Sequence, residues 1–187
     1  MREQHPNSLE KVGVGLVCSV ETYRGCNIEL VKRQSGFNGL STNKDGEVRK
    51  IEVKSMEKSF NWIAISGLIA IDKLFFERDY WIYFVLLPHN YVVMTKGLPF
   101  IKRQLSFSEN PDFVASIQDW MKMTRRLTRG SGLKFLPKLQ VKFPVSIDKL
   151  VEHLIEYPDD NTWHDSVIEI WDNKGSWNCL YVAPEKE

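Results

Sequence analysis

Glu52 and Lys54 are the residues whose types and spacing point most directly to chemistry. They stand two positions apart in the run VRKIEVK at residues 48–54, which has the β-branched residues typical of a strand. Because side chains alternate across a strand, Glu52 and Lys54 should share one face while Ile51 and Val53 share the other. The run therefore predicts an acid and an amine side by side, roughly 7 Å apart along the strand.

Such a pair fits phosphodiester hydrolysis, which needs a divalent cation, an oriented water and an offset for developing negative charge. Glu52 can bind Mg²⁺ or Mn²⁺, and the backbone carbonyl of Val53 can add a second oxygen. Lys54 can orient the water or stabilise the phosphate. A Glu-x-Lys tripeptide alone is a weak signal, because an exposed ion pair on an edge strand is its commoner explanation.

The elements around this pair predict an α/β fold. Residues 37–54 form a β-hairpin closed near Asp45-Gly46, after a helix over 8–25 and a short strand over 28–32. Gly13 and Gly15 weaken that helix, or permit its close packing on a sheet. A helix over 63–78, a buried strand over 80–87 and an edge strand over 91–95 follow. The order predicts a mixed central sheet flanked by helices.

The hairpin also resembles a known family. Its stretch GFNGL at residues 36–40, followed by DGEVRKIEVKS at 45–55, is similar to the PD-(D/E)xK nuclease superfamily. Within that superfamily it looks most like the domain named after the C-terminal part of plant NO VEIN proteins. The likeness continues to DYWIYFV at residues 79–85 and covers about 70 residues. It implies a restriction-endonuclease-like core over residues 1–100, a Mg²⁺ or Mn²⁺ cofactor, and Asn38, Glu52 and Lys54 as the catalytic positions.

The sequence departs from the family at two acidic positions. Asn38 stands where the family has its metal-binding aspartate, and Leu16 where it tends to carry a glutamate in the first helix, with Glu21 a substitute one turn later. The implied metal ligands are therefore Asn38, Glu52, Val53 and Glu21. Either Asn38 is natural and the site is a degenerate one used for binding, or it was introduced to silence an active enzyme. Leu16 favours the first explanation, because a single designed change does not account for it.

Charge is distributed unevenly along the 187 residues. Residues 148–187 carry a net charge of −7, which leaves +8 on residues 1–147 and +1 in total. No acidic residue stands between Asp119 and Asp148. The candidate DNA-backbone contacts in that basic segment, residues 122–142, are Lys122, Arg125, Arg126, Arg129, Lys134 and Lys138. The alternative is a solvated basic face that pairs with the acidic segment of the same chain.

Residues 101–187 are predicted to form a mainly helical extension, with helices over 111–126, 146–155 and 162–171. Three cysteines without a Cys-x-x-Cys pair argue against a disulfide framework or a zinc site and favour reduced, buried thiols. The sequence has no uncharged apolar stretch of eighteen residues, and its N-terminus has no signal-peptide pattern. We therefore expect a cytoplasmic protein.

Two functions follow as expectations. The first is a Mg²⁺-dependent nuclease acting on DNA in a bacterial, archaeal or phage restriction, defence or DNA-processing system. The second is a degenerate nuclease fold that binds DNA or assembles with protein subunits or a second copy of the chain. In a third arrangement, the acidic segment covers the basic one as an autoinhibitor or DNA mimic.

Overall fold

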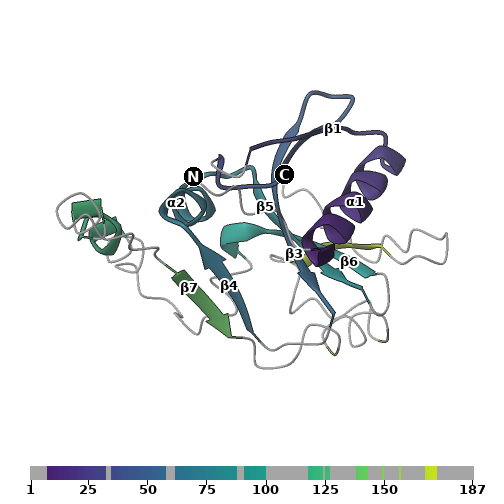
Figure 1. Ribbon diagram of the computed structural model, residues 1–187. Coiled ribbons are helices and arrows are strands. Elements are labelled where there is room, and N and C mark those ends of the chain that lie inside the picture. The colour runs from purple at the N-terminus through teal and green to yellow at the C-terminus, as the bar shows by residue number, and fades with distance from the viewer. Residues whose placement is uncertain are drawn as a thin grey trace.

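The described residues form a six-stranded mixed sheet with helices on both of its faces (Figure 1). The computed structural model describes residues 8–32, 35–57, 62–87, 91–99, 118–123, 125–126, 138–142, 149, 156 and 167–171. The elements in chain order are α1 (Ser8–Tyr23), β1 (Asn27–Leu30), β2 (Gly39–Thr42), β3 (Val48–Met56), β4 (Trp62–Ser66), α2 (Leu68–Phe76), β5 (Tyr80–Leu86), β6 (Tyr91–Lys96), β7 (Lys138–Lys142) and β8 (Val167–Trp171).

The strand order in the main sheet is β1-β2-β3-β5-β6-β8, and β4 pairs with β7 in a separate two-stranded sheet. Among the strand pairs that the described residues form in the main sheet, only β3–β5 is parallel. In that pair Glu52 lies opposite Ile82 and Lys54 opposite Phe84. A parallel pair needs a crossover connection, and α2 lies within it. The sheet therefore places the Glu52 strand at its centre, between β2 and β5.

The two faces of the sheet bury different side chains because β5 is apolar throughout and is buried along its whole length. On the α2 side, Tyr80, Ile82 and Phe84 pack with the apolar stripe of α2. On the α1 side, Trp81 and Tyr83 pack with residues of α1 and β3. Figure 1 shows α1 and α2 on opposite sides of the sheet. Each helix thus closes one core.

The first helix, β1, the β2–β3 hairpin and β5 agree with the sequence prediction. Strand β6 forms as predicted, but it is not an edge strand because it pairs with β8 as well as with β5. β2 and β3 pair antiparallel with Thr42 opposite Val48, and Gly46 adopts a φ of 83° in the connecting turn. Asn43 closes this turn, because its side-chain oxygen accepts hydrogen bonds from the backbone N–H groups of Asp45 and Glu47. The coarse prediction of a mixed α/β sheet with flanking helices is therefore confirmed.

The predicted helix over residues 63–78 is wrong in its first part. Residues Trp62–Ser66 form β4, and α2 begins only at Leu68 after Gly67, whose φ is 96°. The β-branched Ile63 and Ile65 favour an extended chain. The partner strand β7 is far away in the sequence, so local periodicity does not reveal the pairing.

The prediction of a helix over residues 162–171 is also wrong, because Val167–Trp171 form β8 beside β6. The run VIEIW at these positions is rich in β-branched and aromatic residues, which favour a strand over a helix. Residues 118–123 and 125–126 are helical as predicted, whereas the expected helix over 146–155 lies almost entirely outside the described residues. The segment after residue 100 therefore supplies strands to both sheets as well as a helix.

The described residues bear on two further sequence expectations, which concern membrane-spanning segments and the cysteines. In the described part of the chain, no helix is both long and apolar enough to cross a membrane. Cys18 and Cys26 are free and half-buried, and burial raises the pKa of both thiols, with the negative charge of Glu21 adding to the effect. Cys179 lies outside the described residues.

Gly13 lets α1 approach β3 closely, which was one of the two interpretations of the glycines in this helix. A Cβ at Gly13 would lie 2.8 Å from the Ser55 Cβ, whereas a Cβ at Gly15 would meet nothing within 4 Å. We expect Gly13→Ala to lower the free energy of unfolding by about 1 to 3 kcal/mol, because the helix must move off the sheet. The matched change Gly15→Ala should raise it by about 0.5 to 1 kcal/mol through helix propensity. Urea denaturation measures both, and equal effects of the two changes would contradict this packing.

Candidate functional site

Asn38 continues the β2–β3 pairing one step past the end of β2. Its backbone N–H donates to the Ile51 carbonyl at 2.8 Å, one residue out of the register in which Gly39 lies opposite Ile51. Its side-chain oxygen then accepts the Val53 N–H at 2.7 Å, so the amide replaces the next backbone acceptor. Asn38 is thereby fixed beside the part of β3 that holds Glu52 and Lys54, as the sequence predicted.

Glu52 and Lys54 lie on the α2 side of β3 and contact each other directly. The Lys54 Nζ is 2.6 Å from the Glu52 Oε1, and their side chains are 23% and 13% exposed, respectively. Ile51 and Val53 point to the opposite face and are buried in the α1 core. The alternation expected from the sequence is therefore present, and both charged groups are largely withdrawn from solvent.

The loop that carries Asn38 is attached to α2 and β5 by three contacts. Tyr80 donates its hydroxyl hydrogen to the Gly36 carbonyl at 3.0 Å, and the Lys73 Nζ lies 5.4 Å from the centroid of the Phe37 ring. Gly36 has a φ of 77°, and a Cβ there would lie 3.0 Å from the backbone N of Ala70. Only glycine fits this position without displacing α2.

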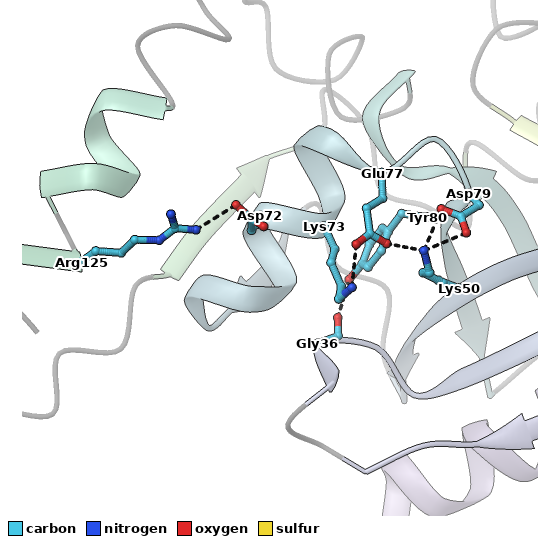
Figure 2. A network of polar contacts seen from close by, with 8 residues as sticks. All are labelled: Gly36, Lys50, Asp72, Lys73, Glu77, Asp79, Tyr80 and Arg125. Atoms are coloured by element: carbon cyan, nitrogen blue, oxygen red, sulfur yellow. Dashed lines mark hydrogen bonds and ion pairs between the residues drawn. The ribbon is translucent and has the colours of Figure 1, made fainter.

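A second charged cluster lies two residues before Glu52 on the same face of β3. Lys50 is 2.7 Å from Glu77 and 2.9 Å from Asp79, and Glu77 also accepts from Lys73 at 2.6 Å (Figure 2). Partial burial acts to raise the pKa of Glu77, but the hydrogen bonds and charges of Lys50 and Lys73 outweigh it and lower that pKa. The cluster ties β3 to the end of α2 and to the turn before β5.

Tyr80 lies between this cluster and the Glu52–Lys54 pair. Burial raises its pKa far above the ordinary value, and the negative charges of Glu52 and Glu77 add to that effect. The hydroxyl therefore stays protonated and serves as the donor to Gly36. Lys50, Lys73, Glu77 and Tyr80 were not among the predicted site residues. The alternation of β3 could have pointed to Lys50, but the others come from elements whose placement depends on the folded sheet.

Glu21 lies on the other face of the sheet, within the α1 core. Its carboxylate is fully buried and accepts hydrogen bonds from Ser41 and, at 2.7 Å, from Tyr83, while Arg24 lies 3.2 Å away. The structure therefore brings Glu52 and Lys54 into contact and places the Asn38 side chain on the Val53 N–H between them. Asn38 also lines a pocket with residues of α1, and Glu21 does not reach Glu52 or Lys54. Leu16 packs partly buried against the same α1 core.

The described donor atoms around Glu52 do not fit a Mg²⁺ site as they stand. Glu52 supplies the one carboxylate, and one of its oxygens already binds Lys54. The side-chain oxygen of Asn38 already accepts from Val53. Within the described residues there is no group of three or more histidine, cysteine, aspartate or glutamate side chains that could hold a metal. Because carboxylate charge is what holds so strongly hydrated an ion, the set is short of charge.

The predicted DNA-contacting residues are described only in part. Lys122, Arg125 and Arg126 are exposed on the helical residues 118–123 and 125–126. Arg125 binds Asp72 of α2 at 3.1 Å (Figure 2), and Lys122 lies 3.2 Å from Asp119. Lys138 begins β7 opposite Ser66. Arg129 and Lys134 lie outside the described residues.

Comparison of the chain with protein families, with curated proteins and with solved structures finds no match.

The Lys50–Glu77–Lys73 cluster predicts an acid-sensitive contribution to stability. Because the folded-state pKa of Glu77 lies below its ordinary value of 4.5, its contribution is complete above that pH and is lost as the pH falls through the lower folded-state pKa. Below pH 4.5 we expect the free energy of unfolding to fall less in Glu77→Gln than in the unchanged chain. The difference should be less than about 1 kcal/mol because the group is partly exposed. Urea denaturation between pH 3 and 7 measures it, and the exposed Glu57→Gln is the control. Parallel curves of unfolding free energy against pH for the unchanged chain, Glu77→Gln and Glu57→Gln would contradict the role of the cluster.

Proposed function

We propose that this chain is a catalytically degenerate nuclease fold of the PD-(D/E)xK type that serves as a DNA-binding or assembly subunit. The observation that carries the proposal is the occupancy of the candidate metal ligands by the protein itself. Val53 N–H holds the Asn38 oxygen and Lys54 holds Glu52. Glu52 and Lys54 stand at the positions that the resemblance assigns to the family's acid and lysine, and an amide stands at position 38, where the family has a carboxylate.

The order of elements supports the nuclease-like core. α1, the β2–β3 hairpin, the crossover with α2 and the buried strand β5 follow one another as the resemblance implies. The site lies on the central strand, where β2 ends and Asn38 takes over its pairing. A degenerate member of the family would keep this order of elements after the loss of one acidic side chain.

Active Mg²⁺-dependent DNA hydrolysis is the second candidate, and the orientation of Val53 favours it. The N–H and C=O of one strand residue point to the same neighbouring strand. The Val53 carbonyl therefore points to the edge where Asn38 already holds the Val53 N–H. Glu52, this carbonyl and an acidic side chain at position 38 together would supply two carboxylates and a neutral oxygen to a hard cation.

Asn38→Asp distinguishes the two candidates. An aspartate can keep the Val53 N–H bond with one oxygen and present the other to a cation, so Mn²⁺ affinity measured by calorimetry should rise about tenfold or more. The unchanged chain should bind DNA without cutting it in Mg²⁺ or Mn²⁺. Cleavage by Asn38→Asp, abolished by adding Lys54→Ala, would identify a site that lacks only one charge. Cleavage by the unchanged chain would contradict degeneracy, and an inert Asn38→Asp on every DNA and RNA form would exclude the enzymatic candidate.

The exposed cations of the basic segment predict salt-dependent DNA binding. Exposed ion pairs such as Arg125–Asp72 and Lys122–Asp119 contribute about 0 to 1 kcal/mol, so phosphates can compete with their carboxylates. We expect Lys122→Glu and Arg126→Glu each to weaken DNA binding and to reduce the slope of log affinity against log salt by about 1. Lys44→Glu, in the exposed β2–β3 turn, is the control with the same charge change. Fluorescence anisotropy at several salt concentrations measures all three, and equal slopes would remove the segment from the interface.

A further inference from the structure

A pocket of about 460 Å³ opens where the end of α2, the start of β5 and the end of β6 meet. Its volume falls in the range of about 300 to 1,000 Å³ that is typical of small-molecule sites. Arg78 and Lys96 contribute cations and Glu77 a carboxylate. Apolar and aromatic surface comes from Phe75, Phe76, Tyr80, Leu98 and Pro99. The pocket does not include Asn38, Glu52 or Lys54.

The charge of this pocket is positive, because its one carboxylate is already offset. Glu77 lies between Lys50 and Lys73, which contact its two oxygens at 2.7 and 2.6 Å (Figure 2). Arg78 and Lys96 are exposed, and within the described residues neither is paired with a carboxylate. Two cations from separate elements therefore remain to receive an anion at one pocket.

The pocket also presents an exposed aromatic ring. Phe76 is 41% exposed although it ends a helix whose other face is buried in the core. Leu98 packs partly buried beside the same core. A flat ring next to apolar surface is a platform for stacking another flat ring, which is how proteins hold unpaired bases.

We infer that this pocket binds a nucleotide, with Phe76 stacking on the base and Arg78 and Lys96 contacting the phosphate. A phosphate alone would leave the aromatic ring in water, and a base alone would leave the two cations without an anion. A nucleotide satisfies both parts. It can come from a free mononucleotide or from a unit of a single DNA strand, and in the second case the inference rests on the proposed DNA-binding function.

Calorimetric titration of the full chain tests the inference with deoxyadenosine monophosphate and its two halves, deoxyadenosine and deoxyribose 5-phosphate. We expect the nucleotide to bind at least about tenfold more tightly than either half. Arg78→Ala and Lys96→Ala should each weaken nucleotide binding about tenfold and leave deoxyadenosine binding unchanged. Phe76→Ala should weaken both nucleotide and deoxyadenosine binding by about tenfold.

Lys44→Ala is the matched control, since it removes an exposed cation far from the pocket lining in sequence and should leave nucleotide affinity unchanged. Circular dichroism melting of each variant verifies folding, which we expect to be retained because the three pocket side chains are exposed. A nucleotide that binds no better than its halves, or binding that is unaffected by all three pocket variants, overturns the inference.

Binding of a single-stranded oligonucleotide distinguishes a free mononucleotide from a unit of a DNA strand. It also tests the pocket inference separately from the proposed DNA-binding function. If Phe76→Ala weakens oligonucleotide binding as well, the occupant is a unit of the strand. If it weakens mononucleotide binding alone, the occupant is a free nucleotide, and the site still stands. If the three pocket variants do not affect nucleotide binding but Lys122→Glu and Arg126→Glu still weaken DNA binding, only the pocket inference is contradicted. If the pocket variants weaken nucleotide binding but Lys122→Glu and Arg126→Glu leave DNA binding unchanged, only the DNA-binding function is contradicted.

Discussion

Three charged side chains on one face of a central strand constrain this structure more than any other feature. Lys50, Glu52 and Lys54 follow one another on the α2 side of β3, between β2 and β5. A charge withdrawn from water destabilises a fold unless a partner offsets it. Lys50 is accordingly bound by Glu77 and Asp79, and Glu52 and Lys54 bind each other. The end of α2 and the turn before β5 are placed where they supply these partners.

This arrangement is costly as a means of stability alone. A buried ion pair is often no more stabilising than well-packed apolar side chains of the same volume. The other face of β3 uses that apolar solution at Ile51 and Val53, which are packed under α1. The charged face is therefore the one whose residue types call for a functional explanation, and the Glu52–Lys54 pair next to Asn38 provides its centre.

Glu21 shows the contrasting case of a charge with a structural role. Its carboxylate is fully buried, and its oxygens are bound by Ser41 of β2, Tyr83 of β5 and Arg24, the residue after α1. Every one of these contacts joins α1 to the sheet or to the residue following α1. Removing a carboxylate held in this way leaves the facing donors without an acceptor, which is costly in a protein interior. The α1 face thus maintains the fold, and the α2 face holds the candidate site.

Much of this arrangement was predictable from sequence because it depends on local patterns. The alternation at residues 51–54, the Asp45-Gly46 turn and the apolar run of β5 each act over a few residues, and all three appear in the structure. β4 was predicted as part of a helix, and its pairing with the distant β7 could not be predicted from local patterns. β8 was predicted as a helix although its own β-branched and aromatic residues favour a strand. The partners of Lys50 were missed for the same reason as the β4–β7 pairing. Glu77 and Asp79 reach it only after the parallel pairing of β3 with β5 has formed.

Tyr80 connects the two sites proposed for the α2 face. Its hydroxyl donates a hydrogen bond to the Gly36 carbonyl in the loop that carries Asn38, and Tyr80 also lines the Arg78–Lys96 pocket. The ring is 1% exposed and lies at the first residue of β5, so it has little room to turn without breaking the contact with Gly36. A ligand that pressed on this ring would therefore act on the position of Asn38 through one hydrogen bond. The same rigidity means that a ligand which leaves the ring in place leaves the Glu52–Lys54 site undisturbed.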